Sequence, residues 1–146
     1  MVENAAPVNS PDGFPGQSLG LPPSGRGSLA TWQTRITALV VDWAASMAVA
    51  TGLFGAGVLF GDGWRSWMIM AVFFVESSVL SALTGGSFGQ LLTKIAVFRL
   101  DAQPLGFVRA LIRAALVCLV VPAVVIGADR RGLHDVAVGT VVIRRR

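Results

Sequence analysis

The sequence predicts an all-α membrane protein: an antiparallel transmembrane helical hairpin, a third apolar helical element and a small cytoplasmic β-ribbon. Of the 146 residues, 53% are hydrophobic and only 14% are charged, against about a quarter in an ordinary soluble domain. The mean hydropathy is +0.67. Two long apolar runs, residues 36–60 and 66–84, each contain a single charged residue. A soluble protein of this size would leave much of that surface in water, because small domains bury only about two-thirds of theirs.

The segment 1–28 differs in composition from the rest of the chain. It holds five of the seven prolines, with scattered glycine and serine and no apolar run. Such a segment buries too little surface to offset the entropy cost of ordering it. We therefore expect a disordered tail over 1–28, followed by a membrane domain over 29–146. The tail lacks the basic start and apolar core of a secretory signal, so the N-terminus is expected to stay in the cytoplasm.

The two apolar runs are expected to form the hairpin. At 1.5 Å per residue, residues 36–60 can cross about 30 Å of hydrocarbon with some tilt. Residues 66–84 form the second span after a short link. Trp32 flanks one end of the hairpin, and Trp64 and Trp67 flank the other, as aromatic residues do at membrane interfaces.

A third element is expected at about residues 107–128, and its course is left open. Its uncharged part, 114–128, has a length at which a re-entrant segment is as plausible as a span. A full crossing would divide the basic residues equally between the two sides. If the element enters and leaves on one side, every basic residue except Arg65 faces the cytoplasm. The positive-inside tendency favours this second arrangement, and three full spans remain the alternative.

Residues 92–100 and 136–143 are rich in β-branched side chains and indicate short strands. A lone strand leaves backbone groups unpaired, so pairing the two would satisfy both. The strands can pair only on the same side of the membrane. The sequence therefore predicts a cytoplasmic β-ribbon and two cytoplasmic termini.

Small residues recur at every fourth position of the first span: Ala44, Ala48, Gly52 and Ala56. Such residues allow close approach of helices in lipid, where hydrophobicity itself gives no association force. We expect this stripe to pack against the second span, and a homodimer face is the alternative.

Two carboxylates inside the spans are the main candidates for function. A carboxylate in a spanning helix costs about 2.5–3.5 kcal/mol, so it normally faces a partner or water. Asp42 lies ~10 Å from the inner end of the first span, and Glu76 ~12 Å from that of the second. Two nearby acids in a low dielectric cannot both ionise cheaply, so one holds a proton or both share a cation. Alternatively, they neutralise Arg35, Arg109 or Arg113 and hold the helices together.

Several other functions are excluded or disfavoured. The single cysteine, Cys118, rules out an intramolecular disulfide, and the single histidine, His134, rules out a multi-histidine metal site. There is no nucleophile elbow, P-loop or dinucleotide glycine pattern, so we expect no enzyme activity and no cofactor. The net charge is +4, but the basic residues border the apolar runs. They predict contact with the lipid bilayer and no nucleic-acid binding.

Several motifs in this order resemble the RDD family of bacterial membrane proteins, named for one arginine and two aspartates. They are Arg35 and Asp42 in the first span, the turn GGSFGQLL at 85–92, the helix start RALIR at 109–113, and RRGLHDVAVGTVV at 130–142. The resemblance covers about residues 29–146 and implies that the name-giving positions are Arg35, Asp42 and Asp135. Family members usually carry Thr-Pro-Gly-Lys where this chain has Ser-Phe-Gly-Gln at 87–90. The missing lysine puts any role of that cation in doubt.

The resemblance implies a location in the bacterial cytoplasmic membrane and suggests transport, with cation/proton exchange proposed for some members. In the transport hypothesis, Asp42 and Glu76 are the protonatable groups. Arg35 and Arg113 are their electrostatic partners. Asp135 and His134 act as a cytoplasmic gate. One hairpin is too little to enclose a path, so transport requires a homo-oligomer or a larger complex. The rival hypothesis is a non-transporting scaffold whose buried charges are structural.

Overall fold

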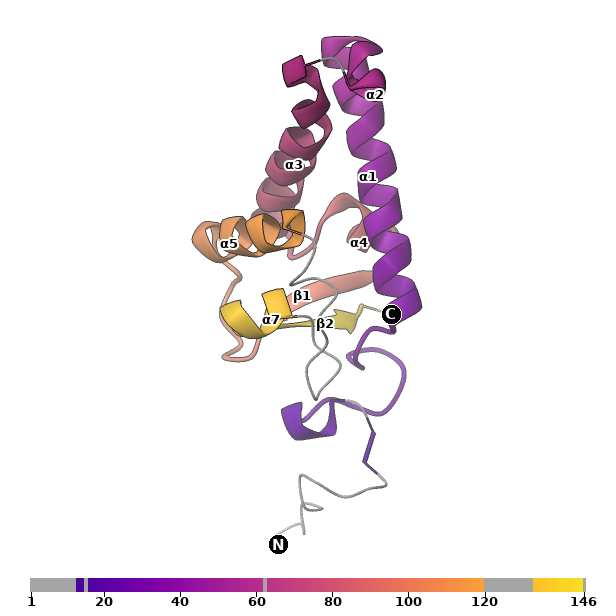
Figure 1. Ribbon diagram of the computed structural model, residues 1–146. Coiled ribbons are helices and arrows are strands. Elements are labelled where there is room, and N and C mark those ends of the chain that lie inside the picture. Colours follow the sequence, from indigo (N-terminus) through magenta and orange to yellow (C-terminus); the bar gives the residue numbers. More distant parts are fainter. Residues whose placement is uncertain (1–12, 15, 62, 120–132, 146) are drawn as a thin grey trace, which may run out of the picture.

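The computed structural model describes residues 13–14, 16–61, 63–119 and 133–145. Two long helices, α1 (Trp32–Phe54) and α3 (Met68–Thr84), form a hairpin that is closed at its tip by the short helices α2 (Gly57–Phe60) and η2 (Gly63–Trp67) (Figure 1). The helix Trp32–Phe54 and the segment Gly63–Thr84, in which η2 leads into α3, are each long and apolar enough to cross a membrane. The predicted pair of apolar helices is therefore confirmed.

The ends of the arms follow local rules. Thr31 caps the start of α1, where its hydroxyl accepts a hydrogen bond from the Thr34 N–H at 3.3 Å. Helix α3 ends at Gly85, which has a φ of 81° that favours glycine.

The buried face of α1 is not the one that the small-residue stripe predicted. Every fourth residue is buried, namely Ala38, Asp42, Ser46 and Ala50. The predicted stripe faces outward and is exposed: Ala44, Ala48, Gly52 and Ala56. The prediction that the stripe packs on the second span is wrong. Both faces carry small residues, and the buried one also carries a carboxylate and a hydroxyl that gain from leaving lipid.

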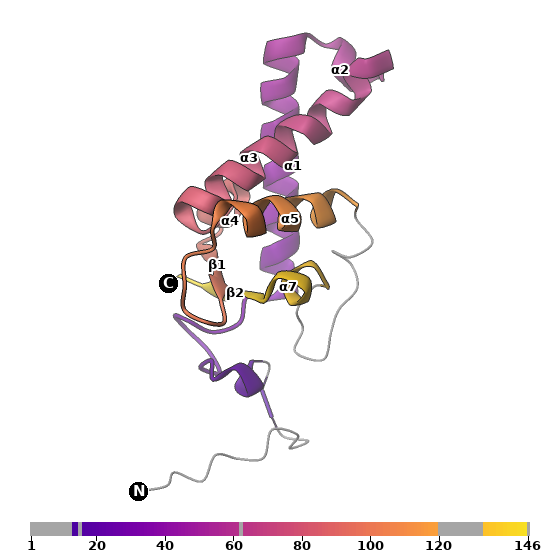
Figure 2. The same ribbon diagram turned by 90° about the vertical axis from the view of Figure 1, so that its left-hand side faces the viewer.

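Two shorter helices lie at the base of the hairpin. Helix α4 (Phe88–Leu92) packs against α1, and α5 (Phe107–Cys118) crosses below α3 in both views (Figures 1 and 2). Helix α5 begins where the third element was expected. Its outward side is apolar, with Val108 68% exposed, whereas Arg113 is buried. The rest of the predicted element, residues 120–128, lies outside the described residues.

Strands β1 (Ile95–Arg99) and β2 (Thr140–Arg144) form an antiparallel ribbon with Val97 opposite Val142. The predicted pairing of these two segments is confirmed. However, residues 136–138 belong to helix α7 (Leu133–Val138) rather than to the strand. Gly139, with a φ of 68°, turns the chain from α7 into β2.

The segment before α1 extends the ribbon. The Gly27 N–H donates to the Arg144 carbonyl at 2.9 Å, and the Arg144 N–H donates to the Ser28 carbonyl at 2.9 Å. Gly27 and Ser28 therefore belong to the sheet edge, although they fall within the predicted 1–28 tail. Residues 1–12 lie outside the described part of the chain.

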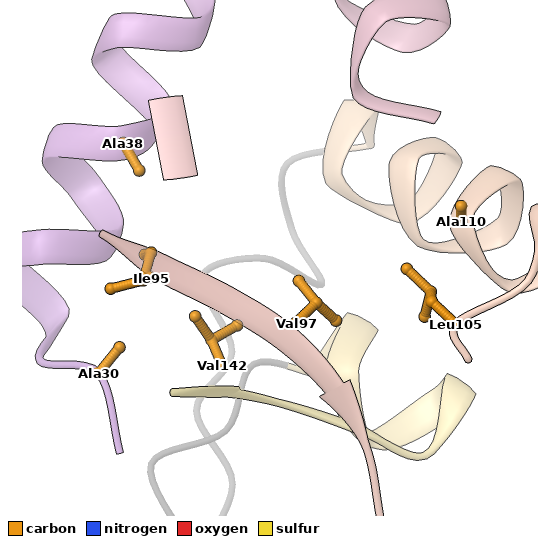
Figure 3. Close-up of a cluster of buried hydrophobic side chains, with 7 residues drawn as sticks. All are labelled: Ala30, Ala38, Ile95, Val97, Leu105, Ala110 and Val142. Carbon is orange, nitrogen blue, oxygen red and sulfur yellow. The ribbon is translucent and has the colours of Figure 1, made fainter. Parts of the chain in front are cut away.

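A cluster of buried apolar side chains ties the ribbon to α1 and α5 (Figure 3). It consists of Ala30, Ala38, Ile95, Val97, Leu105, Ala110 and Val142. Higher in the hairpin, the rings of Trp43 and Phe73 stack at 5.3 Å between centroids. The base of the hairpin is thus a packed layer, and the candidate site lies directly above it.

Candidate functional site

The site is organised around the start of α4. Ser87 precedes this helix in an extended conformation, and its hydroxyl accepts a hydrogen bond from the Gln90 N–H at 3.4 Å. In return, the Gln90 side-chain oxygen accepts the Ser87 N–H at 3.0 Å. This reciprocal capping box fixes the first turn of the helix. The N–H groups of residues 88 and 89 remain available, as the first N–H groups of a helix always do.

Both carboxylates of the spans bind this helix start. Oδ2 of Asp42 accepts the Ser87 hydroxyl at 2.6 Å, and Oδ1 accepts the Gly89 N–H at 2.6 Å. Oε1 of Glu76 accepts the Phe88 N–H at 2.8 Å. Asp42 and Glu76 therefore meet at the three consecutive residues 87–89. The sequence places the two acids at similar depth on separate helices. The second Glu76 oxygen, Oε2, is buried and has no hydrogen-bond partner among the described residues.

Gly89 allows this close approach. A Cβ atom at this position would lie 1.9 Å from the carbonyl oxygen of Ala38 and 3.0 Å from Cγ of Asp42. Any side chain would push α4 off α1, because real Cβ contacts are never this short. The glycine thus brings the α4 backbone within hydrogen-bond distance of the Asp42 carboxylate.

The second aspartate of the family resemblance lies at the centre of a separate cluster. Asp135 is fully buried, and its Oδ1 accepts hydrogen bonds from Nε of Arg113 at 2.9 Å and from the Thr140 hydroxyl at 3.0 Å. Nη1 of Arg35 lies 3.7 Å from Oδ2. The carboxylate that pairs with both arginines is therefore Asp135, whereas the hydrogen bonds of Asp42 go to the start of α4.

The remaining predicted residues lie around this cluster. Arg109 donates to the carbonyl oxygen of Val138, so it holds the end of α7 rather than a carboxylate of the spans. His134 lies in α7 next to Asp135. The orientation of its side chain lies outside the described part of the structure.

A cavity of about 80 Å³ joins the two clusters. Among apolar residues, its lining includes the polar side chains of Arg35, Asp42, Ser77, Ser87, Gln90, Arg113 and Asp135. A buried water needs on the order of 10–15 Å³ of such volume, so the cavity has room for several waters or for a small cation. The two arginines and two aspartates of the lining have formal charges that cancel. A proton or a cation in this cavity would have carboxylate and hydroxyl oxygens within reach.

A family model described as the RDD family matches residues 29–139. The chain belongs to the RDD family. The match confirms the resemblance, and with the two apolar helices it indicates a membrane protein. No curated protein and no solved structure matches the chain. Arg35, Asp42 and Asp135, the positions that the resemblance implies as name-giving, all line the same cavity.

Sequence reasoning missed the residues that hold the two carboxylates. Ser87, Gly89 and Gln90 belong to the segment interpreted as a glycine-rich turn. The signal that could have found α4 is the Ser-x-x-Gln pattern at 87–90, the sequence form of a capping box. Gln90 stands where the resemblance implies a lysine, and here its side chain closes the capping box.

Proposed function

We propose that this RDD protein exchanges protons for cations across the bacterial cytoplasmic membrane, with Asp42 and Glu76 as the groups that bind them in turn. The observation that carries the proposal is the meeting of both intramembrane carboxylates at the start of α4, next to a cavity that Asp42 lines. Oε2 of Glu76, which has no hydrogen-bond partner among the described residues, adds an acceptor at this place. The protein acts as a carrier and not as an enzyme.

The proposed exchange follows from the hydrogen bonds that the two carboxylates accept from α4. An ionised carboxylate accepts hydrogen bonds more strongly than a protonated one. When Asp42 or Glu76 takes a proton, the hydrogen bond that it accepts from an N–H group of α4 weakens. When it releases the proton, a cation takes the same oxygens and the charge of the site is unchanged. One proton is thus exchanged for one monovalent cation, and α4 is the element that moves.

The Arg35–Asp135–Arg113 cluster has a supporting role in this proposal. It joins α1, α5 and α7 at one wall of the cavity. A buried pair of this kind is costly to break, because removal of one partner leaves an unpaired charge. The cluster, together with His134, is proposed as the cytoplasmic gate, because its opening would connect the cavity to that side.

Transport also requires more protein than one hairpin. The outward stripe on α1 supports self-association through that face, since small residues allow close helix packing in lipid. A Cβ atom at Gly52 would have no neighbour within 4 Å, so this face has room for a second helix. A homo-oligomer is our proposal, and a larger membrane complex is the alternative.

The test is cation-driven proton movement in liposomes reconstituted with the full chain. Asp42→Asn and Glu76→Gln each keep an oxygen for the α4 N–H group but cannot titrate. We expect both variants to lose flux while they retain the elution profile of the folded wild type. Asp101→Asn is the matched control, since Asp101 is exposed at a turn and binds Arg99. Equal flux in Asp42→Asn, or no flux in the wild type, contradicts the proposal.

A non-transporting scaffold is the second candidate, and one observation favours it. Both oxygens of Asp42 are hydrogen-bonded, and Asp135 pairs with two arginines. Charges satisfied in this way can be purely structural. The scaffold predicts that Asp42→Asn lowers expression or assembly, and that no ion gradient affects the protein. The flux measurement separates the two candidates.

A further inference from the structure

A second hollow lies on the outer side of the ribbon, away from the cavity. It encloses about 390 Å³ and is lined by Arg26, Gly27, Phe98, Ile143, Arg144 and Arg145. Three of these six residues are arginines. We call it the basic groove.

Backbone pairing builds the groove from distant parts of the chain. The hydrogen bonds of Gly27 and Ser28 to Arg144 place Arg26 beside the end of β2. The Arg145 N–H donates to the Lys94 carbonyl at 2.8 Å, which adds a fourth basic residue at the edge. Gly27 has a φ of 85°, a backbone conformation that favours glycine.

None of the carboxylates that the structure describes pairs with the basic residues of the groove or with Lys94. Each of the four is engaged elsewhere: Asp42 and Glu76 at α4, Asp101 with Arg99, and Asp135 with Arg35 and Arg113. Within the described part of the chain, no carboxylate lies within 4.0 Å of a basic group of Arg26, Lys94, Arg144 or Arg145. Clustered guanidinium groups of this kind match the geometry of a phosphate, which they bind through paired N–H groups.

The position of the groove relative to the hairpin indicates what kind of molecule carries the phosphate that the groove binds. Arg145 donates to the carbonyl oxygen of Thr84, the last residue of α3. The groove therefore begins where an apolar helix ends, which is the level of the lipid headgroups.

The floor of the groove is apolar. Phe98 is 50% exposed. The ribbon register pairs Phe98 with Val141, so Ile143 lies two residues further on the same face. This floor suits the glycerol and first methylenes of a lipid better than a fully hydrated anion.

We propose that the basic groove binds the phosphate headgroup of an anionic phospholipid in the leaflet at the base of the hairpin. The arginines hold the phosphate, and Phe98 with Ile143 contacts the apolar part beneath it. This inference does not depend on the transport proposal, because none of the groove residues lines the cavity between α1, α3 and α5.

The test is native mass spectrometry of the full chain in detergent, titrated with phosphatidylglycerol or phosphatidylcholine. Each basic residue near an anionic surface contributes roughly a fivefold factor in affinity. We expect Arg26→Gln with Arg144→Gln to lower phosphatidylglycerol affinity by more than about tenfold. Arg26→Lys with Arg144→Lys should retain most of it. Arg65→Gln at the far tip, where Arg65 lies over Trp64, is the positional control and should leave it unchanged.

Three outcomes would overturn the proposal. If the wild type binds phosphatidylcholine as tightly as phosphatidylglycerol, or if the double glutamine variant binds like the wild type, the groove is not an anionic-lipid site. If inorganic phosphate displaces the lipid at equal concentration, the groove takes a soluble anion instead. Thermal midpoints measured in lipid-free detergent show whether the variants are folded, so loss of binding cannot be confused with unfolding.

Discussion

The N–H of Gly89 donates to the carboxylate of Asp42 at 2.6 Å, and the two residues lie 47 positions apart in the chain. This bond fixes the short helix α4 against α1. It is possible because residue 89 has no side chain between α4 and the Ala38 carbonyl. Together with the Ser87 hydroxyl, the Gly89 N–H gives the carboxylate two donors at the base of the hairpin, which reduces the cost of burying it.

Gly89→Ala should therefore destabilise the protein strongly. The added Cβ would lie 1.9 Å from a backbone oxygen that no rotamer change can move. Overpacking of this kind costs about 1–3 kcal/mol or more. Thermal unfolding in detergent measures the effect. Gly52→Ala is the matched control, because its Cβ would have no neighbour within 4 Å. It should be neutral or slightly stabilising, since alanine favours helix, and an equal loss in both variants would refute the close approach.

Ser87→Ala should cost more than the loss of an ordinary helix cap. Its hydroxyl both caps α4 and donates to Asp42. Loss of a cap costs about 0.5–2 kcal/mol, and loss of a hydrogen bond to a charged group adds about 1.5–3 kcal/mol. Thr31→Ala removes the cap of α1, which is exposed and contacts no carboxylate. We expect the thermal midpoint of Ser87→Ala to lie well below that of Thr31→Ala. The reverse order would mean that Ser87 is only a cap.

The Arg113–Asp135 pair should show strong coupling in a double-mutant cycle. Both side chains are buried. Removal of Asp135 leaves Arg113 without its carboxylate, and removal of Arg113 leaves Asp135 with only the more distant Arg35 at 3.7 Å, so either loss should cost about 3–5 kcal/mol. The double substitution should recover part of this loss. The Arg99–Asp101 pair, in which Asp101 is half-exposed, serves as the comparison and should show much weaker coupling. Additive losses at Arg113 and Asp135 would contradict the cluster.

The register of the ribbon can be tested by disulfide formation. In a Cys118→Ser background, cysteines at Ala96 and Ile143 lie directly opposite and should be oxidised readily. Cysteines at Phe98 and Ile143 are two residues out of register, roughly 7–8 Å apart, and should be oxidised poorly. Mass spectrometry of oxidised membranes distinguishes the pairs. Efficient bridging of only the second pair would require a different register.

Much of this architecture could be predicted because it depends on local apolar content. The hairpin follows from two runs with one charge each, and the ribbon from two β-rich segments that need partners. The depth of Asp42 and Glu76 followed from counting along the helices. Their meeting point did not, because it depends on α4, whose five residues are too short to show helical periodicity.

Other features depend on tertiary packing. The two faces of α1 that could meet α3 have the same spacing of small residues, and only the cost of exposing Asp42 and Ser46 to lipid distinguishes them. Residues 136–138 are β-branched or small, yet they are helical between Asp135 and Gly139. Burial of Asp135 against Arg113 outweighs their strand propensity, and neither contact can be read from the local sequence.

The most direct test of the central claim is labelling of the full chain in membranes with an apolar carbodiimide, which reacts with protonated carboxyl groups. Peptide mass spectrometry identifies the modified residues at several concentrations of Na⁺ or K⁺. We predict that Asp42 or Glu76 is labelled and that one of these cations protects it, whereas Asp135, which is paired with two arginines, is not labelled. Labelling of Asp42 and Glu76 that neither cation changes, or no labelling of either, would contradict a proton-and-cation site at the start of α4.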